Sequence, residues 1–191
     1  MPMTPARTGR HDREHIIGIA LELLDRYGLP DLTMRRLATE LEVQPSALYW
    51  HFDSKQDLLA AVSDRILARI PDAEPGIDLL GAAHAVRDAL LSYRDGAEVV
   101  LSSAALRPGR SRAEDALRAA LSPALADAGL AATAVLQFIL GHTTLVQQRM
   151  HGESHGAASS AGEPADGEDA AVFEAGIALL SRGAGLMPTP R

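Results

Sequence analysis

The stretch from Leu32 to Asp57, LTMRRLATELEVQPSALYWHFDSKQD, limits the possible folds of this chain more than any other. Thr33 stands where a helix needs an N-cap oxygen, and Pro45 suits the first position of a helix. Ser54 begins an S-x-x-D pattern, which is typical of the start of a further helix. The stretch therefore predicts two short helices, a tight turn between them and the start of a third. Helix-turn-helix units of this size bind DNA, with the second helix in the major groove.

Three consecutive side chains in the second of these helices, Tyr49, Trp50 and His51, carry polar groups on aromatic rings. Successive helical residues are about 100° apart, so at least one of the three must point away from the core. Aromatic edges and hydrogen-bond donors next to Lys55 suit contacts with phosphates and bases. The alternative is an ordinary three-helix core in which Trp50 is buried.

Composition favours an all-α fold and a local attraction to DNA. Aromatic residues make up 4% of the chain and apolar residues 47%, with Ala, Leu and Gly plentiful. The net charge is −7, and residues 1–70 hold nine Lys/Arg against ten Asp/Glu. A DNA-binding protein needs only a local basic patch. Candidate members of such a patch are Arg7, Arg10, Arg13, Arg35, Arg36 and Lys55.

Several protein classes are disfavoured by what the sequence lacks. There is no cysteine, and hence no disulfide framework and no thiolate metal site. We expect a cytoplasmic protein, because the sequence shows no signal peptide and no apolar run of membrane-spanning length. We expect neither an enzyme nor a cofactor, since there is no G-x-S-x-G motif, phosphate loop or cysteine nucleophile. A purely structural helical dimer would leave the run from Tyr49 to His51 unexplained.

Apolar residues at helical spacing place the remaining elements. The first helix is expected at about 10–27, with Tyr27 on its buried face, and a connecting helix at about 55–70. Residues 102–111 are an expected loop, and residues 152–168, rich in Gly, Ala, Ser and acids, are expected to lack order. The other expected helices cover about 77–93, a short segment from an Asp95 cap through Leu101, 111–128 with a kink at Pro123, 131–150 and 169–182.

The histidines of the second half allow a functional and a structural interpretation. His151 and His155 flank Glu153 and could form a metal site. However, glycines directly after both histidines would break the helix needed to align them, which favours a solvated polar loop. His142 interrupts the helix at 131–150, whose apolar residues run almost all round it, a pattern typical of burial on more than one side. His142 is either a core histidine or a ligand contact.

The segment TMRRLATELEVQPSALYWHFDSKQDLL, residues 33–59, resembles the DNA-binding domain of the tetracycline-repressor (TetR) family. Its LYWH run is especially similar to the tetracycline repressors themselves. The resemblance continues at residues 89–101, ALLSYRDGAEVVL, and more loosely at residues 140–145, LGHTTL. Residues 1–9 carry two prolines and no periodicity, so we expect a flexible arm there. The resemblance implies a helix-turn-helix DNA-binding domain at 10–54, a connecting helix at 55–70, and a ligand-binding and dimerisation domain at 71–191.

The resemblance implies a ligand-responsive transcriptional regulator, with a repressor favoured, that binds a palindromic operator as a homodimer. The helices at about 131–150 and 169–182 would form the dimer. A ligand in the body would shift the connecting helix and change the spacing of the two recognition helices. These helices must fit major grooves that lie about 34 Å apart.

The resemblance also assigns DNA contacts. Arg35 matches the arginine that reads guanine in tetracycline repressors, and an arginine bidentate to guanine is the commonest specific base contact. Glu42 departs from the family, which usually has glycine at this turn, and a non-glycine residue with positive φ costs on the order of 1 kcal/mol. The expected DNA contacts are Thr33, Arg35, Arg36, Gln44, Pro45, Ser46, Ala47, Tyr49, Trp50, His51 and Lys55.

The second domain departs from the tetracycline repressors where they bind a magnesium–drug chelate. Val100 stands at the position of a metal-ligating histidine, and Met150 stands at about that of a carboxylate holding a metal-bound water. Ala82 and Val86 replace an asparagine and a phenylalanine that grip the drug. We therefore expect no metal site, and a small, largely apolar effector. The expected pocket residues are Val86, Leu90, Val100, Leu136, Phe138 and His142.

Overall fold

The computed structural model describes residues 12–72, 76–106, 111–121, 125, 127–154 and 166–183, and its regular secondary structure there is entirely α-helical. The helices are α1 (Arg13–Tyr27), α2 (Met34–Glu40), α3 (Pro45–Leu48), α4 (Lys55–Leu67), α5 (Leu79–Leu91), α6 (Gly96–Leu106), α7 (Arg112–Ala120), α8 (Ala128–Ser154) and α9 (Asp166–Gly183). The expected all-α fold is confirmed. The expected arm at 1–9 and the expected start of the first helix at residue 10 lie outside the described residues.

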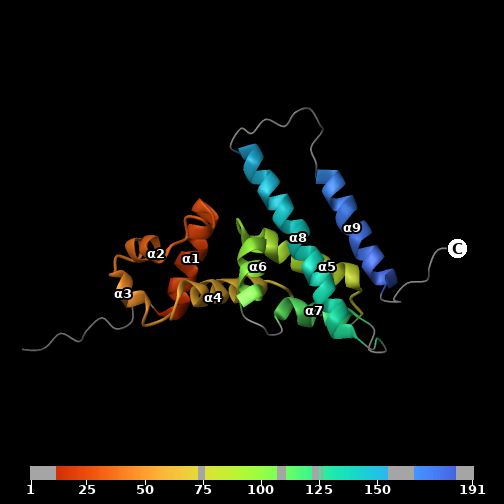
Figure 1. Ribbon diagram of the computed structural model, residues 1–191, viewed down its shortest axis with the longest axis horizontal. Coiled ribbons are helices and arrows are strands. Elements are labelled where there is room, and N and C mark those ends of the chain that lie inside the picture. The colour runs from red at the N-terminus through yellow and green to blue at the C-terminus, as the bar shows by residue number, and fades with distance from the viewer. Residues whose placement is uncertain are drawn as a thin grey trace, which may run out of the picture.

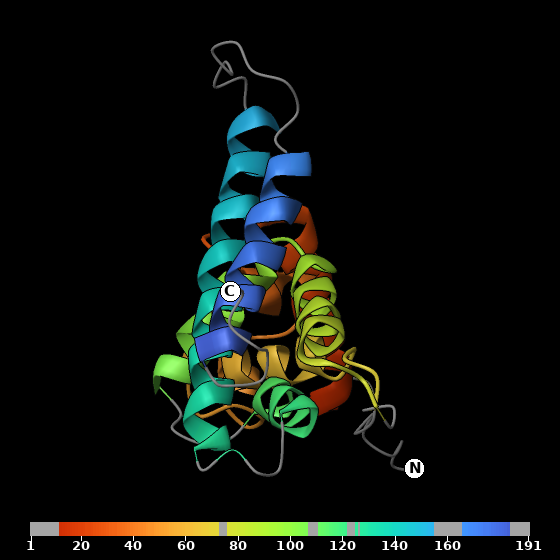
Figure 2. The same ribbon diagram turned by 90° about the vertical axis from the view of Figure 1, so that its right-hand side faces the viewer.

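The helices form a head, made of α1, α2 and α3, and a larger body, and α4 joins the two. In Figure 1 the head lies at one end of the molecule, and α4 runs from it past α6 into the body. α8 and α9 lie side by side and antiparallel at the other end (Figures 1 and 2). α5, α6 and α7 lie between α4 and α8 and contact both helices.

Capping side chains fix where many of these helices begin. The expected caps at Thr33 and Ser54 are confirmed, because each side chain accepts a hydrogen bond from the backbone N–H three residues later. Pro45 opens α3, as its fixed φ predicts. Asp12, Asp78 and Ser111 cap α1, α5 and α7 in the same way. Each cap contributes about 1 kcal/mol, so local chemistry sets these starts.

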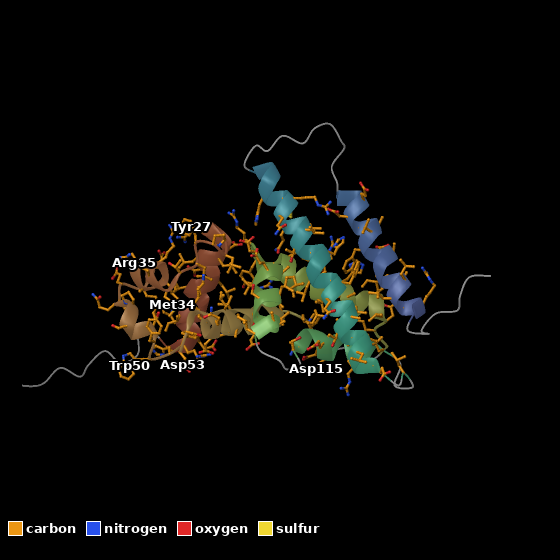
Figure 3. The ribbon with its side chains drawn as sticks, in the orientation of Figure 1. Tyr27, Met34, Arg35, Trp50, Asp53 and Asp115 are labelled. Carbon is orange, nitrogen blue, oxygen red and sulfur yellow. The ribbon has the colours of Figure 1, made fainter. Side chains whose placement is uncertain are left out.

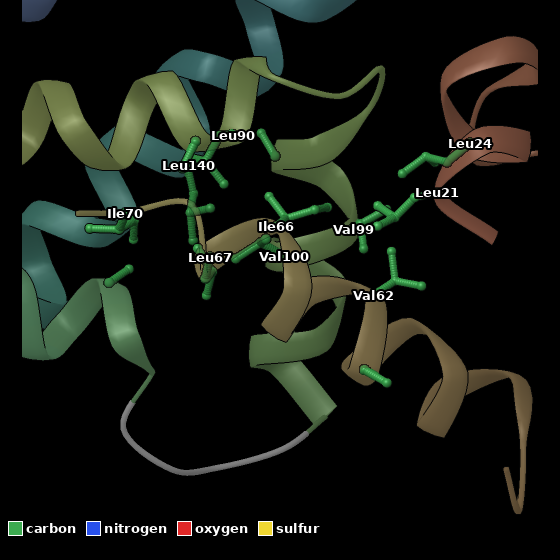
Figure 4. Close-up of a cluster of buried hydrophobic side chains, with 14 of the residues drawn as sticks. Leu21, Leu24, Val62, Ile66, Leu67, Ile70, Leu90, Val99, Val100 and Leu140 are labelled. Atoms are coloured by element: carbon green, nitrogen blue, oxygen red, sulfur yellow. The ribbon is translucent and has the colours of Figure 1, made fainter. Parts of the chain in front are cut away.

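A continuous apolar core joins the head to the body through α4. Leu21 and Leu24 of α1 approach Val62 of α4 and Val99 of α6 (Figure 4). Further along the chain, Ile66, Leu67 and Ile70 meet Leu90, Val100 and Leu140 of the body (Figure 4). Close-packed interiors transmit displacements rather than absorb them. A shift of α4 in the body must therefore reach the head.

A buried carboxylate adds a polar link between the two parts. Asp95 Oδ2 accepts a hydrogen bond of 2.7 Å from the N–H of Leu29, in the loop after α1. Asp95 Oδ1 lies 3.2 Å from Nδ1 of His151 on α8. The expectation that Asp95 caps the next helix is wrong, because its side chain reaches the head and its backbone is left-handed, with φ 55°.

Two expected boundaries in the middle of the chain are also wrong. α6 continues to Leu106 through part of the expected loop at 102–111, because it packs along α4 and α8. α7 ends at Ala120, where Leu121 becomes extended with φ −84° and ψ 151°, and does not form one kinked helix with the residues that follow. Pro123 lies outside the described residues. The longer α6 goes with tertiary packing, which sequence spacing does not report, whereas α7 ends three residues before Pro123, a residue that disfavours helix at and before its own position.

α8 and α9 extend into both ends of the segment 152–168, whose central residues lie outside the described part of the chain. The expectation that Gly152 breaks the helix is therefore wrong. α9 packs closely on α8 at Gly176. This glycine of α9 lies so near Phe138 of α8 that a Cβ there would clash with the phenylalanine ring. The buried side chains of α8 recur at helical spacing on one broad face, and Leu145 on the opposite face is 57% exposed, so the prediction of burial on more than one side is wrong for the described chain.

α8 combines length with an apolar composition, and its stretch Ala128–Gly152 could cross a membrane on those two criteria. The expectation that no run reaches that length is therefore wrong. In the fold, however, α8 packs against α5, α6, α7 and α9. The amide of its buried Gln147 accepts a hydrogen bond of 3.1 Å from the N–H of Ala97 and donates one of 2.8 Å to the carbonyl of Tyr93. These contacts are those of a core helix.

The turn between α2 and α3 is left-handed at Glu42, whose φ is 55°. Two backbone hydrogen bonds hold it: the N–H of Glu42 donates to the carbonyl of Thr39 at 3.1 Å, and the N–H of Val43 donates to the carbonyl of Ala38 at 2.9 Å. The turn is therefore not reshaped to suit glutamate, and the chain carries the strain.

Replacing Glu42 with glycine should raise the free energy of unfolding by a few tenths to about 1 kcal/mol, because glycine adopts positive φ without strain. Urea denaturation of the purified chain measures the change. Asp95→Gly is a matched control, since Asp95 has the same φ of 55° but its carboxylate binds the N–H of Leu29. That variant should lose stability. A clear loss of stability in Glu42→Gly would contradict the strain at this turn.

Candidate functional site

The recognition segment, residues 44–51, begins as α3 and continues as tight turns, so the prediction that Tyr49, Trp50 and His51 lie within the second helix is wrong. Its last residue, His51, donates its backbone N–H to the carbonyl of Leu48 at 3.0 Å. Leu48 and the following Phe52 are buried and anchor the segment to the head. The other side chains of the segment are therefore left to face outward. Gln44, Pro45, Ser46, Tyr49 and Trp50 are exposed, and Ala47 and His51 are half-buried.

The exposure of Trp50 distinguishes between the two interpretations of the run Tyr49–His51. Its side chain is 88% exposed and that of Tyr49 is 53% exposed, so the alternative in which Trp50 belongs to a three-helix core is wrong. Trp50 and Arg35 both lie at the end of the molecule opposite α8 and α9 (Figure 3). Large exposed aromatic side chains at one end of a small domain indicate a surface that binds a partner.

Arg13 of α1 anchors the recognition segment through its guanidinium group. Its Nη1 donates a hydrogen bond of 2.5 Å to the carbonyl of His51, and its guanidinium lies 4.3 Å from the centre of the Phe52 ring. The same group lies 3.6 Å from a carboxylate oxygen of Asp57, in the first turn of α4. Arg13 therefore ties α1, the recognition segment and α4 together. From the sequence, Arg13 was predicted only as a member of a basic patch, because no local pattern indicates this role.

The remaining cations of the expected basic patch differ in what surrounds them. Arg35 is exposed on α2, and Lys55 is half-buried at the first position of α4. Arg36 instead forms an ion pair of 2.6 Å with Asp31. Arg7 and Arg10 lie outside the described residues. Arg35 and Lys55 are thus the members of the patch that the described structure leaves without an ion pair.

Two further side chains of the head have fixed structural contacts. The expectation that Tyr27 lies on the buried face of α1 is wrong: it is 39% exposed, and the Arg36 guanidinium lies 4.3 Å from its ring centre. A cation–π contact of this kind stabilises an exposed ring without burying it. Thr33 uses its hydroxyl oxygen to cap α2, accepting from the N–H of Arg36 at 3.1 Å.

The body contains a cavity of about 540 Å³ between α4, α6, α7 and α8. Val100 and Leu136, two of the expected pocket residues, line this cavity. The other four, Val86, Leu90, Phe138 and His142, do not line it. The structure therefore does not bring the six expected residues into this one cavity, although its volume is typical of small-molecule sites.

The polar part of the cavity lining was not predicted from the sequence. Asp64 of α4, Glu114 of α7 and Gln137 of α8 contribute to it. Hydrophobic periodicity marks apolar helix faces and gives no information about polar side chains that face inward. The one available pattern was the S-x-x-E capping box that starts α7, in which Glu114 Oε2 accepts from the N–H of Ser111 at 2.9 Å.

His142 lies in an aromatic cluster between α8 and α9. Its ring centre is 5.9 Å from that of Phe138 and 5.4 Å from that of Phe173. It is buried, and neither ring nitrogen has a hydrogen-bond partner in the described structure. Burial lowers the pKa of His142 below its ordinary value, and the positive charge of Arg87 lowers that pKa further. His142 is therefore held as a neutral imidazole among aromatic rings.

The possible metal site at His151 and His155 is not what the structure shows for His151. His151 approaches the Asp95 carboxylate, and His155 lies outside the described residues. Within the ranges that the structure describes, no group of three or more His, Asp or Glu residues could hold a metal ion. The described part of the chain therefore gives no support to a metal centre.

Known proteins match the chain over both of its parts. Residues 16–62 match the family model described as "Bacterial regulatory proteins, tetR family". The chain is 35% identical to tetracycline repressor protein class C of Escherichia coli, and the alignment covers 90% of this chain and 89% of that protein.

Two solved structures extend the likeness to the whole fold. One is BioQ with its natural double-stranded DNA operator, at 35% identity and a TM-score of 0.72, covering 93% of this chain and 99% of that chain. The other is a variant of TetR from Acinetobacter baumannii AYE in complex with minocycline, at 32% identity and a TM-score of 0.69, covering 91% and 96%. This chain therefore belongs to the tetR family of bacterial regulatory proteins.

Proposed function

We propose that this protein represses transcription by binding a palindromic DNA operator as a homodimer, and that a small molecule in the body releases it. The observation that carries the proposal is the outward face of the head, where Tyr49 and Trp50 are exposed at the same end as Arg35. Regulation of transcription also implies a cytoplasmic protein without catalytic activity.

The experiment is selection of bound sequences from random duplex DNA. A palindromic motif supports the proposal, and failure to retain any duplex contradicts it.

The DNA contacts follow from exposure and side-chain chemistry. We infer that Arg35 donates to a guanine edge and that Gln44 and Ser46, both exposed at the start of α3, reach base edges. The proposed phosphate contacts come from Thr33, Arg36, Tyr49, His51 and Lys55, of which Arg36 must first exchange its ion pair with Asp31. Pro45, Ala47 and Trp50 supply apolar contacts to sugars and thymine methyl groups. The BioQ complex, solved with its operator, supports this mode of binding.

The proposed dimer forms through α8 and α9. Exposed apolar side chains occur along both helices: Leu145 and Met150 on α8, and Val172 and Leu179 on α9. Burying such side chains between two copies is favourable by about 25 cal/mol for each Å² of apolar area. A twofold axis there would place two heads side by side, each with its own recognition segment, as a palindrome requires.

The cavity provides the proposed effector site. It is bounded by α4, whose other contacts include α1 in the head. A ligand that fits better when α4 has moved shifts the population toward that arrangement. Because Arg13 ties the start of α4 to the recognition segment, this movement changes the separation of the two recognition segments. The minocycline complex of the Acinetobacter relative supports a small-molecule site in a body of this fold.

Arg35→Ala should weaken operator binding by about 1–3 kcal/mol and relax specificity at one position in each half-site. Lys55→Ala should weaken binding to all sequences alike and reduce the dependence of affinity on salt, because a phosphate contact is lost. Fluorescence anisotropy with operator variants at several salt concentrations measures both effects. Equal losses on every sequence from both variants would refute the base contact of Arg35.

Trp50→Ala should leave the free energy of unfolding within about 0.5 kcal/mol of the parent, because the side chain is exposed. The same variant should lower operator affinity roughly tenfold, as loss of a large aromatic contact does. Leu48→Ala is the contrasting variant, since burial of Leu48 predicts a loss of about 2–5 kcal/mol in stability. Unchanged operator affinity in Trp50→Ala would contradict a DNA contact at Trp50.

Magnesium–tetracycline should not release this protein from its operator. Val100 and Met150 cannot ligate a metal or hold a metal-bound water, and Ala82 offers no amide to the drug. Band-shift titration with tetracycline, with and without magnesium, checks this. Release at micromolar drug concentrations that disappears on chelation of the metal would overturn the expectation.

A further inference from the structure

The cavity that the proposed function assigns to the effector has an uneven charge. Asp64 of α4 and Glu114 of α7 line it, and they lie on different helices. None of the described residues that line the cavity is Lys, Arg or His. The lining therefore carries two formal negative charges, and no positive charge among its described members balances them.

The hydrogen bonds of the lining satisfy part of Glu114 but supply no balancing formal charge. Thr133 donates its hydroxyl proton to Glu114 Oε1 at 3.0 Å or to the carbonyl of Gly129 at 3.1 Å. Ser111 caps α7, and its hydroxyl lies 3.5 Å from Glu114 Oε2. Both hydroxyl protons are thus directed at acceptors within the chain. What a ligand meets in this part of the cavity is an excess of hydrogen-bond acceptors.

The two carboxylates also differ in how firmly they are held. Glu114 is fixed by the capping box and by Thr133, so its position is set before any ligand arrives. Asp64 is exposed and forms no ion pair in the described structure, and it stands on the helix that joins body and head. A cation in the cavity would therefore interact with a fixed charge on α7 and an adjustable one on α4.

Most of the remaining lining is apolar, with Leu67, Leu101 and Leu140 beside Val100 and Leu136; Ser63, Ser103 and Gln137 are its uncharged polar members. A site of this kind favours a ligand with an apolar body and a separate charged group. From these charges and contacts we infer that the effector is a cationic amphiphile: an organic ammonium whose charge lies between Asp64 and Glu114 and whose apolar part lies against α6 and α8. The inference rests on the proposed function, because it names the ligand class of the same cavity.

Three probes that share an apolar body test the charge preference: naphthylmethylamine, naphthylmethanol and naphthoate. Calorimetric titration of the full chain at neutral pH should show that the amine binds about tenfold more tightly than the alcohol, with naphthoate weakest. Asp64→Asn and Glu114→Gln should each lower amine affinity about three- to tenfold, while alcohol affinity stays within about twofold. Glutamine preserves the capping box, so Glu114→Gln keeps the start of α7.

Two control variants complete the design. Glu22→Gln removes one negative charge from the exposed surface of α1 and should leave amine affinity unchanged. Ser103→Phe places a ring in the cavity and should abolish binding of the amine. Tighter binding of the alcohol or of naphthoate, if blocked by Ser103→Phe, would overturn the cationic class and leave the effector cavity standing. Absence of binding by all three probes, or binding that survives Ser103→Phe, would overturn both.

Discussion

The packing of α4 on two sides is the constraint on which the rest of this structure depends. Val62 and Ile66 contribute to the same apolar core as Leu21 of the head and Val100 of the body. Head and body therefore do not form separate cores joined by a linker. The ion pair between Arg13 and Asp57 continues the connection to the recognition segment. In such an arrangement the cavity wall and the proposed DNA-binding surface belong to one mechanical unit, which is the physical requirement for coupling two sites.

The beginnings of several helices could be predicted from local chemistry, but their ends could not. Thr33, Pro45 and Ser54 act within a few residues of themselves, so their roles are visible in the sequence. Glu42 is similar, because a tight turn needs its left-handed backbone whatever surrounds it. α6 continues along helices distant in sequence, and α7 ends just before Pro123, where a kink and not an end was predicted. Hydrophobic spacing alone therefore misplaced both.

The candidate sites show the same division between local and distant causes. Exposure within the run Tyr49–His51 was predicted from helical spacing, although the run lies in turns after α3. The accessibility of the arginines could not be predicted from the sequence, because it depends on tertiary contacts. Arg36 forms an ion pair with Asp31, and Arg13 donates to the carbonyl of His51. The pocket prediction was limited for a related reason. Apolar periodicity identified Val100 and Leu136 in the wall, whereas Asp64 and Glu114 reach the cavity through tertiary placement.

The exposed indole at the tip of the head has an optical consequence. The chain contains a single tryptophan, Trp50, so its intrinsic tryptophan fluorescence comes from one position on the outward face of the recognition segment. In the free protein that indole is largely hydrated, and its emission is that of a water-exposed ring. The same emission is insensitive to packing within the body, because no other indole contributes. If DNA binds at the proposed recognition surface, a chromophore at this place reports that binding without any added label and separates it from changes around the distant cavity.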